Sequence, residues 1–440
     1  MEAKLTDILA AREDRARQQS QLLAQFQKPL ICFTMNIAGP TKSSSLITQG
    51  HTLGCRALQA QLQGEHLPIL HFAKRETSAG WEAFVVVDGD PMELKRLTCQ
   101  IEDSFPAARL FDMDVITPEG QKISREQLGL GSRKCLLCGN DVLLCSRNRA
   151  HSVEALQEKT TALLQEAVAE DKCQRIAALA VQSLLYEVCI TPKPGLVDCN
   201  NAGSHKDMDI FTFMASGSTL FPYFMHCART GIDTPSLSPT QMLEKLRFPG
   251  KLAETAMFSA TNGVNTHKGA IFSLGLLCAA AGRLDTTKPE ALLQLCAAMT
   301  KGITQKELVN AAGKTAGERL YRAQGVSGAR GQAEAGFPGA RIGLAKLETG
   351  LEQGLSLNDA GCAALLEIIA TTADTNLLSR SDPESCRNMQ EEIATLLKDT
   401  PFPSQEALVA LDARFIEKNL SPGGCADLLA LALFLHFYGQ

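Results

Sequence analysis

The residue types and their hydrophobic periodicity change near residue 170, and this change constrains the fold more than any other feature. Before it, runs rich in β-branched and aromatic residues alternate with runs of helical spacing. After it, strand patterns nearly vanish, and Ala, Leu, Glu and Gln dominate runs of about ten to twenty residues. The sequence therefore predicts two domains, an α/β or α+β domain over residues 1–170 and an all-α domain over residues 171–440.

Three short runs in the first part of the chain predict β-strands. They span Pro29–Ile37, Trp81–Gly89 and Ala108–Ile116. The segment between the last two has helical spacing and begins with Pro91, which suits the first turn of a helix. A further helical stretch over Ser152–Ala169 is expected to link this domain to the rest of the chain.

Composition and charge narrow the class of protein. Of the 440 residues, 45% are hydrophobic, which is enough for sizeable cores and too much for disorder. The net charge of −5 argues against a general binder of nucleic acids or acidic membranes. The fifteen cysteines are an odd number and are scattered, which favours reduced thiols over a disulfide framework.

The two ends of the chain indicate where the protein is found. The N-terminal segment is charged throughout and lacks the apolar region of a signal peptide. The longest apolar stretch, near Leu428–Phe437, is far shorter than the ~20 residues that cross a membrane, and it predicts a buried final helix. We therefore expect a cytoplasmic protein that has neither a membrane nor a nucleic acid as a partner.

A pair of carboxylates lies on the third predicted strand. In FDMDV, Asp112 and Asp114 are two positions apart, so both side chains point to one face while Phe111, Met113 and Val115 face the core. Two such carboxylates can share Mg²⁺, which prefers oxygen ligands and phosphates. The alternative is an ordinary solvent-facing strand surface.

Cysteine and histidine then gather over a short segment. Cys135, Cys138, Cys145 and His151 form C-x2-C-x6-C-x5-H, and thiolates with an imidazole at this density can make a tetrahedral zinc site. No second C-x2-C accompanies them. Buried or free thiols in a cysteine-rich chain are therefore the alternative.

Cations are interleaved with this segment and also follow the first predicted strand. Arg133, Lys134, Arg147 and Arg149 either form a solvated face or bind phosphate oxygens. Lys42 follows a tight Gly-Pro turn in NIAGPTK, on a loop that suits a phosphate or is a simple surface turn.

Two glycine-containing segments resemble phosphate loops but do not fit the pattern. Ala312–Thr315 reads AGKT, but Leu308 stands where a Walker A motif requires glycine. The GLGSRK segment that begins at Gly129 lacks a third glycine. Neither segment is expected to bind phosphate as a P-loop.

The densest polar segment of the second domain spans Tyr186–Asp209. Two prolines stiffen this loop, and stiff loops that hold histidine and carboxylates are where acid–base chemistry is expected. Helix capping explains some of the aspartates, but it does not explain the histidine and the lysine. The candidate residues are Lys193, Asp198, His205, Asp207 and Asp209.

A second polar segment, Thr261–Gly275, has a similar character. If Asn265 or Thr266 caps the helix, His267 and Lys268 lie in its first turn, where the helix dipole disfavours cations. A docked anion would make this placement favourable, because helix N-termini accept anions.

Two further clusters complete the candidate site of the second domain. Asp374, Asn376 and Arg380 lie within two turns of one helix. The glycine-rich segment Gly328–Arg341 carries Arg330. Each cluster alone is more typical of structure than of function, and the prediction of a site rests on their occurring together.

The sequence segments that contain these clusters resemble those of two enzyme families. Through NIAGPTK, ARLFDMDV and the run from Arg133 to His151, the first ~170 residues resemble holo-citrate lyase synthase, the apo-citrate lyase phosphoribosyl-dephospho-CoA transferase. Through TPKPGLVD, GSHKDMD, GVNTHKGAIFSLG, GARGQAEAGF and DTNLLSR, the remaining ~270 residues are similar to triphosphoribosyl-dephospho-CoA synthase. The sequence departs from the family pattern at Gln332, where the family has Glu, and near Ser381 and Asp382, where it has glycines.

The resemblance implies a bifunctional transferase that makes and attaches the prosthetic group of citrate lyase. The helical domain would join ATP to 3′-dephospho-CoA through the ribose of ATP and release adenine. The first domain would transfer the product to a serine of the acyl carrier protein subunit of citrate lyase and release pyrophosphate. The metal pair is also similar to that of nucleotidyltransferases, which is a fold-level analogy.

The resemblance also implies residue roles. The implied catalytic residues are Asp112 and Asp114 with Mg²⁺, and His205, Asp207, Asp209 and His267 for acid–base chemistry. The implied substrate-binding residues are Lys42, Arg133, Arg147, Arg149, Lys193, Asp198, Lys268, Arg330, Asp374, Asn376 and Arg380. The alternative function is a non-catalytic zinc-knuckle adaptor with a helical scaffold that binds proteins.

Overall fold

The computed structural model describes residues 5–309 and 316–440, so the Ala312–Thr315 segment lies outside the described residues. The chain divides into two compact units, Met1–Asp171 (unit 1) and Lys172–Gln440 (unit 2). One long helix, α5 (Val153–Cys189), runs through this boundary. The helix predicted over Ser152–Ala169 is the first half of α5.

Unit 1 combines a small sheet with helices. Its elements before α5 are α1 (Leu5–Phe26), β1 (Leu30–Met35), α2 (Ser45–Gly64), β2 (Ile69–Thr77), β3 (Gly80–Val87), α3 (Pro91–Asp103), η1 (Pro106–Leu110), β4 (Phe111–Ile116), β5 (Lys122–Ile123), η2 (Glu126–Leu128) and α4 (Val142–Arg147).

The five strands form one sheet in the order β2-β3-β1-β4-β5, and every neighbouring pair is antiparallel. This pairing makes unit 1 α+β, which resolves the alternative that the sequence left open. The predicted β-α-β segment is β3-α3-β4, and β1 lies between its two strands. The edge strand β2 was not predicted, because its polar run from Lys74 to Glu76 hides the strand pattern.

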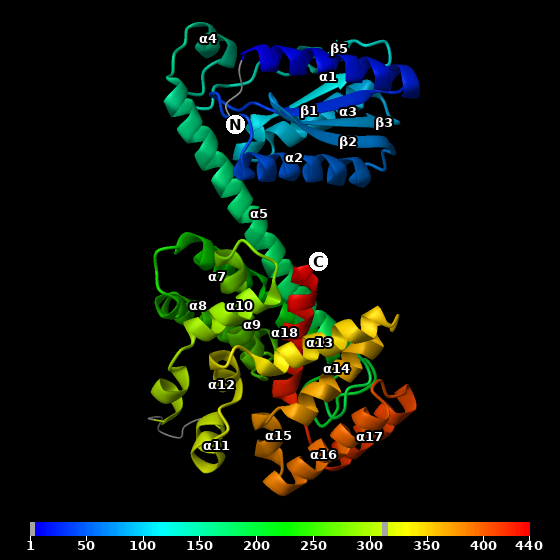
Figure 1. Cartoon of the computed structure of the whole chain (residues 1–440), viewed down its shortest axis with the longest axis vertical. Helices are drawn as coiled ribbons and strands as arrows, with labels where there is room; N and C mark the ends of the chain where they lie inside the picture. Colours follow the sequence, from blue (N-terminus) through cyan, green and yellow to red (C-terminus); the bar gives the residue numbers. More distant parts are fainter. Residues whose placement is uncertain (1–4, 310–315) are drawn as a thin grey trace. The chain divides into compact units, whose positions relative to one another are not determined.

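Both faces of the sheet are covered, as Figure 1 shows for α1 and α2. On one face Ile31, Phe33, Val85 and Met113 pack against buried side chains of α2 and α3. The opposite face packs against the C-terminal part of α1 through a smaller apolar cluster: Leu22, Leu23, Leu30, Cys32, Phe84, Val86 and Ile116. Asp112 and Asp114 belong to this second face, because they stand opposite Thr34 and Cys32 of β1.

Unit 2 is built from helices around one large core. After α5 its elements are α6 (Ile210–Thr219), α7 (Phe221–Asp233), α8 (Pro239–Ala260), α9 (Lys268–Arg283), α10 (Pro289–Met299), the π-helical turn η3 (Gln305–Val309), α11 (Ala316–Gln324), α12 (Gly328–Glu334), α13 (Pro338–Glu352), α14 (Leu357–Thr371), α15 (Thr375–Arg380), α16 (Pro383–Asp399), α17 (Gln405–Glu417) and α18 (Gly423–Gly439). The named elements of its described residues, 172–309 and 316–440, include no strand.

Two helices of unit 2 are apolar nearly all round. The last helix, α18, packs on α9, α13 and α14, and its residues from Leu428 to Leu435 are all buried. The predicted buried final helix is therefore confirmed. In α9, the residues from Leu274 to Gly282 are likewise buried. Over the described part of the chain, no helix has the length and hydropathy needed to span a membrane.

Candidate active sites

The paired aspartates of unit 1 lie on one face of the sheet, as their spacing predicted. Phe111, Met113 and Val115 are fully buried, whereas Asp112 and Asp114 alternate with them and remain partly exposed. The Lys122 ammonium of β5 is 2.6 Å from Asp114. Burial raises the pKa of Asp112, and the neighbouring charge of Asp114 raises it further. A cation placed between these carboxylates would relieve this repulsion.

Arg133 is held beside the start of β4. Its guanidinium donates to the carbonyl of Phe111 at 2.8 Å and also pairs with Glu102, which is 1% exposed. Glu102 in turn accepts from the backbone N–H of Met113 at 2.8 Å and from Arg125 at 3.2 Å. Arg133 therefore has structural partners, and its charge acts on Asp112 from this fixed position.

The remaining predicted phosphate-binding cations of unit 1 lie on the loop after β1 and at the C-terminal end of α4. Lys42 donates to the carbonyl of Ile37 at 2.6 Å within its own loop. Burial lowers the pKa of Lys42, and the charge of Arg12 on α1 lowers it further. Arg147 and Arg149 are exposed on the cysteine-bearing segment.

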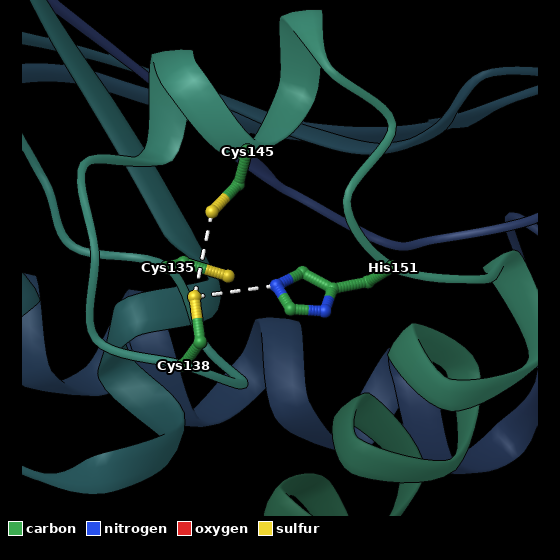
Figure 2. Close-up of side chains that lie close together, drawn as sticks. All are labelled: Cys135, Cys138, Cys145 and His151. Atoms are coloured by element: carbon green, nitrogen blue, oxygen red, sulfur yellow. Dashed lines mark hydrogen bonds between the residues drawn. The ribbon is translucent and has the colours of Figure 1, made fainter.

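The four predicted zinc ligands come together in unit 1. Figure 2 shows the thiols of Cys138 and Cys145 and the ring of His151 pointing toward one another, with Cys135 beside them. Their ligand atoms all lie within 4.8 Å of one another. The Cys138 sulfur is 3.4 Å from that of Cys145 and 3.3 Å from Nε2 of His151.

Most of the predicted site residues of unit 2 line one cavity of about 460 Å³. They come from the polar loop that follows α5, from the start of α9 and from α15, which are far apart in the sequence. The seven residues that share this cavity are Lys193, His205, Asp207, His267, Lys268, Asn376 and Arg380. The polar side chains at this cavity come from three of the four segments that the sequence singled out, and the fourth, Gly328–Arg341, contributes Ala329 to the lining.

Two long helices begin at the cavity wall. Lys268 and Gly269 open α9, and Gly423 and Gly424 open α18. The positive dipole ends of such helices attract anions, while at α9 the N–H groups of Lys268 and Ala270 already donate to Asn265 and Asp427. Lys268 does not lack a counter-charge, because its ammonium lies 3.0 Å from Glu254.

His267 is a neutral histidine that faces the cavity. Its side chain is 3% exposed, and burial lowers its pKa to about 3. Thr266 donates to the Ser216 oxygen at 2.7 Å, and Ser216 lies 2.7 Å from Nδ1 of His267. In the tautomer that carries the ring proton on Nε2, Nδ1 accepts from the Ser216 hydroxyl. Among the described residues, none forms a hydrogen bond with Nε2.

His205 and Arg380 form a second polar group at the same cavity. The Arg380 guanidinium donates to Nδ1 of His205 at 3.3 Å and to the carbonyl of Ser204 at 3.0 Å. Nε2 of His205 is 2.8 Å from the Ser421 hydroxyl. Burial lowers the pKa of His205 and Arg380 lowers it further, while Asp207 opposes them. His205 is thus a neutral residue that orients Arg380.

Two carboxylates that line the cavity, Glu187 and Asp427, were not predicted from the sequence. Glu187, at the end of α5, is buried and pairs with the Lys193 ammonium, so Lys193 is not a free cation. Asp427 lies in the first turns of α18, and burial, with the charges of Glu187 and Asp374, raises its pKa well above the usual range. A Cβ added at Gly269 would stand 2.0 Å from Oδ2 of Asp427, so a larger residue there would require the Asp427 carboxyl group to move.

Four predicted residues do not line the cavity. Asp198 accepts from the backbone N–H of Lys193 at 2.8 Å and shapes the polar loop. Asp209 caps α6, and Asp374 caps α15. Arg330 pairs with Glu307 at 2.7 Å. These contacts are structural, since each satisfies a backbone end or a charge.

Both halves of the sequence match known families. Residues 3–167 match the family of apo-citrate lyase phosphoribosyl-dephospho-CoA transferases. Residues 173–440 match the family of ATP:dephospho-CoA triphosphoribosyl transferases.

Full-length relatives combine both halves. The chain is 36% identical to Protein CitXG of Haemophilus influenzae, over 99% of this chain and 97% of that protein. It is 34% identical to Protein CitXG of Leuconostoc mesenteroides subsp. cremoris, over 98% and 96%. It is also 43% identical to a probable 2-(5″-triphosphoribosyl)-3′-dephosphocoenzyme-A synthase of Albidiferax ferrireducens, over 61% of this chain and 91% of that protein.

Proposed function

Because the chain belongs to the CitXG family of fused transferases, we propose that it makes and attaches the prosthetic group of citrate lyase. Unit 2 converts ATP and 3′-dephospho-CoA to 2′-(5″-triphosphoribosyl)-3′-dephospho-CoA and adenine. Unit 1 transfers this product to a serine of the citrate lyase acyl carrier protein and releases pyrophosphate. The observation that supports the first step best is the cavity of unit 2, where anion-attracting helix N-termini meet a buried carboxyl group.

The first step exchanges one bond to the ribose of ATP for another. The bond between ribose and adenine breaks, a bond to the 2′-hydroxyl of dephospho-CoA forms, and the hydroxyl proton passes to adenine in net terms. Positive charge develops on the sugar, so nearby carboxylates stabilise the transition state. An enclosed site keeps water from taking the place of the hydroxyl.

We assign Asp427 as the proton donor to adenine. Burial raises its pKa and so favours the protonated carboxyl group, which is the state that a general acid needs. Asp207, whose side chain is 64% exposed at the cavity, is the carboxylate that we propose as the base for the 2′-hydroxyl. Asp209 caps α6 and is not assigned a catalytic role.

The triphosphate is proposed to lie against the start of α9. The Nε2–H of His267 is a free donor there, and Lys268 and Arg380 supply positive charge. Lys193 is assigned a positioning role, because its ammonium is bound to Glu187. His267 is therefore proposed as a hydrogen-bond donor and not as a base.

The second step is a phosphoryl transfer. The serine oxygen of the carrier protein bonds to the phosphorus next to the ribose, pyrophosphate leaves, and the serine proton is released. We propose that Asp112 and Asp114 bind Mg²⁺, since their carboxylates share a face and burial with mutual repulsion raises the pKa of Asp112. When bound, Mg²⁺ neutralises charge on the leaving pyrophosphate. Arg133 adds positive charge from its fixed position beside β4.

We make two further proposals, one about the folds of the units and one about the cellular compartment. We propose that unit 2 is all-α throughout and that unit 1 resembles nucleotidyltransferases by fold-level analogy. None of the fifteen cysteines forms a disulfide, and we propose that the protein works in a reducing compartment such as the cytoplasm.

One experiment tests the proposed function. The purified protein is incubated with ATP, Mg²⁺, dephospho-CoA and the citrate lyase acyl carrier protein, and both products are measured. We expect free adenine by chromatography and a carrier protein heavier by one phosphoribosyl-dephospho-CoA group by mass spectrometry. Absence of adenine would refute the function of unit 2. A non-catalytic adaptor, the alternative that the sequence left open, would yield neither product.

A further inference from the structure

Neither reaction uses the cysteine and histidine cluster of unit 1. Among the residues that the structure describes, Cys135, Cys138, Cys145 and His151 are the one group of three or more potential metal ligands that come together. Cys135 is buried, whereas the other three retain access to solvent. A nucleotide transferase has no chemical need for three thiols and an imidazole at one point, so the cluster calls for another explanation.

The distances between the ligand atoms suit a tetrahedral metal ion. With Zn–S bonds of about 2.3 Å, two sulfur ligands of one tetrahedral zinc ion lie about 3.8 Å apart. The Cys138 and Cys145 sulfurs are 3.4 Å apart, and Nε2 of His151 is 3.3 Å from Cys138. All four atoms fit within 4.8 Å, so small movements bring each of them to bonding distance of one ion. Three thiolates and one imidazole form a closed ligand set, which is typical of structural zinc.

The backbone of the C-x2-C turn is also arranged for a metal thiolate. The N–H of Leu137 donates to the Cys135 sulfur at 3.5 Å, so the turn offers a backbone donor to a negatively charged sulfur. The turn closes through hydrogen bonds from Cys135 N–H to the Asn140 carbonyl at 2.6 Å and from Gly139 N–H to the Cys135 carbonyl at 3.2 Å. Gly139 has a φ of 75°, a conformation that glycine adopts without strain.

The segment around the cluster has almost no core of its own. The helix α4 has six residues, and none of them is buried. Leu143 and Leu144 are 55% and 57% exposed. A helix this short is unstable in water by itself, and small segments without a core are usually held by a metal or by disulfides. The structure contains no disulfide among its fifteen cysteines, so a metal is the cross-link that remains.

The segment is attached to the active face of unit 1 at its N-terminal end. Arg133, two positions before Cys135, reaches the Phe111 carbonyl and Glu102. Arg109 donates to the carbonyl of Lys134. A metal at Cys135 therefore fixes the segment that places the Arg133 guanidinium next to Asp112.

The geometry points to a structural zinc ion bound by Cys135, Cys138, Cys145 and His151, which holds Arg133 in position beside the paired aspartates of unit 1. The zinc ion itself takes no part in either reaction. Binding would release the thiol protons, so its affinity would fall at acidic pH.

Metal content tests this proposal without any assay of activity. We would express the untagged full-length protein without added chelator and measure bound zinc by elemental mass spectrometry. We expect one zinc per chain in the parent protein and less than a tenth of that in Cys138→Ser and His151→Ala. The matched control is Cys199→Ser, which removes an exposed thiol of unit 2 and should keep the full zinc content.

Cobalt exchange and product assays separate this proposal from the proposed function. Co²⁺ in a site with three thiolates gives a strong sulfur-to-metal absorption band, which Cys145→Ser should weaken. In Cys138→Ser, carrier labelling should fall about tenfold while adenine release is unchanged. The unchanged release shows that unit 2 has folded, and a retained unfolding transition of unit 1 in denaturant shows the same for unit 1. Absence of zinc from the parent protein, a Cys138–Cys145 disulfide in its place, or full zinc in Cys138→Ser would each overturn the proposal, whatever the outcome for the enzyme activities.

Discussion

The two candidate sites differ in how deeply their polar side chains are buried. In unit 2, part of the site is enclosed in a helical core, where His267 is 3% and Lys193 is 1% exposed, while Asp207 at the same cavity is 64% exposed. In unit 1, the paired aspartates are partly exposed on one face of the sheet, beside Lys122 of β5 and Arg133 of the loop that precedes α4. The difference matches the proposed substrates. A sugar cation must be shielded from water, whereas the serine of a carrier protein must be able to reach the phosphate.

The strongest test of this contrast removes one carboxylate from unit 1. We expect Asp112→Asn to lower carrier labelling about 10³-fold, because a charge that would hold Mg²⁺ is lost. Adenine release should stay within about twofold, since unit 2 is unchanged. Mass spectrometry of the carrier protein and chromatography of adenine report the two steps. Asp88→Asn, which removes an exposed carboxylate paired with Lys28, is the matched control and should affect neither. Loss of both activities in Asp112→Asn would show that the two sites are not independent.

The next largest effect concerns the buried acid of unit 2. We expect Asp427→Asn to lower adenine release about 10²-fold, because general acids typically contribute that much or more. In the parent protein the rate should fall as pH rises through the raised pKa of Asp427, and the variant should lack this alkaline decline. Rates measured over the whole pH range in which the protein stays folded check this prediction. An unchanged pH profile in the variant would remove Asp427 from the role of acid, even if the rate falls.

A smaller effect is expected at the neutral histidine of the cavity. His267→Ala removes one hydrogen bond to a charged phosphate, so we expect adenine release to fall about 30-fold, in line with about 2 kcal/mol. Labelling of the carrier protein with premade triphosphoribosyl-dephospho-CoA should not change. His226→Ala on the exposed side of α7 is the matched control. If His267 were instead the base, the loss would be far greater and would depend on pH.

The smallest expected effect is a loss of folding stability at acidic pH, which can be measured in both units. Burial lowers the pKa of His267 to about 3 and that of His51, stacked on Phe33 in unit 1, to about 4. An unfolded histidine has a pKa of about 6.5, so protons favour the unfolded state as pH falls below that value. Each unit should therefore lose about 2 kcal/mol of stability between pH 7 and pH 5 from this one group.

Denaturant titrations at the two pH values, with one buried histidine replaced at a time, check this effect. His267→Asn should reduce the pH dependence of unit 2 alone, and His51→Asn that of unit 1 alone. A change in both units from a single variant would contradict the independence of the two cores.

Local patterns in the sequence predicted the parts of the fold that local physics controls. The strands β1, β3 and β4 and the helix α3 have clear periodicity or a proline at the helix start, and the facing of Asp112 and Asp114 follows from their spacing. The edge strand β2 was missed because its outward residues are charged. Pairing between strands is a long-range property, so the choice between α/β and α+β needed the structure.

The candidate site of unit 2 was predicted in part. Motif residues such as His267 and Arg380 do meet at one cavity, but Asp198 and Asp374 cap backbone groups, and capping uses the same residue types as catalysis. Asp427 was missed although a signal exists, since it is the lone carboxylate in the apolar sequence of α18. Asp427 and Glu187 line the same cavity although they lie more than two hundred residues apart in the sequence. No local sequence pattern predicts such a long-range contact.

The contact between Gly269 and Asp427 has an evolutionary consequence. The Oδ2 atom of Asp427 occupies the space where any larger residue at position 269 would put its first side-chain carbon. Alanine at position 269 would therefore require the Asp427 carboxyl group to turn away from the start of α9. If Asp427 is the acid that we propose, a lineage that gains this alanine would have to place its proton donor elsewhere.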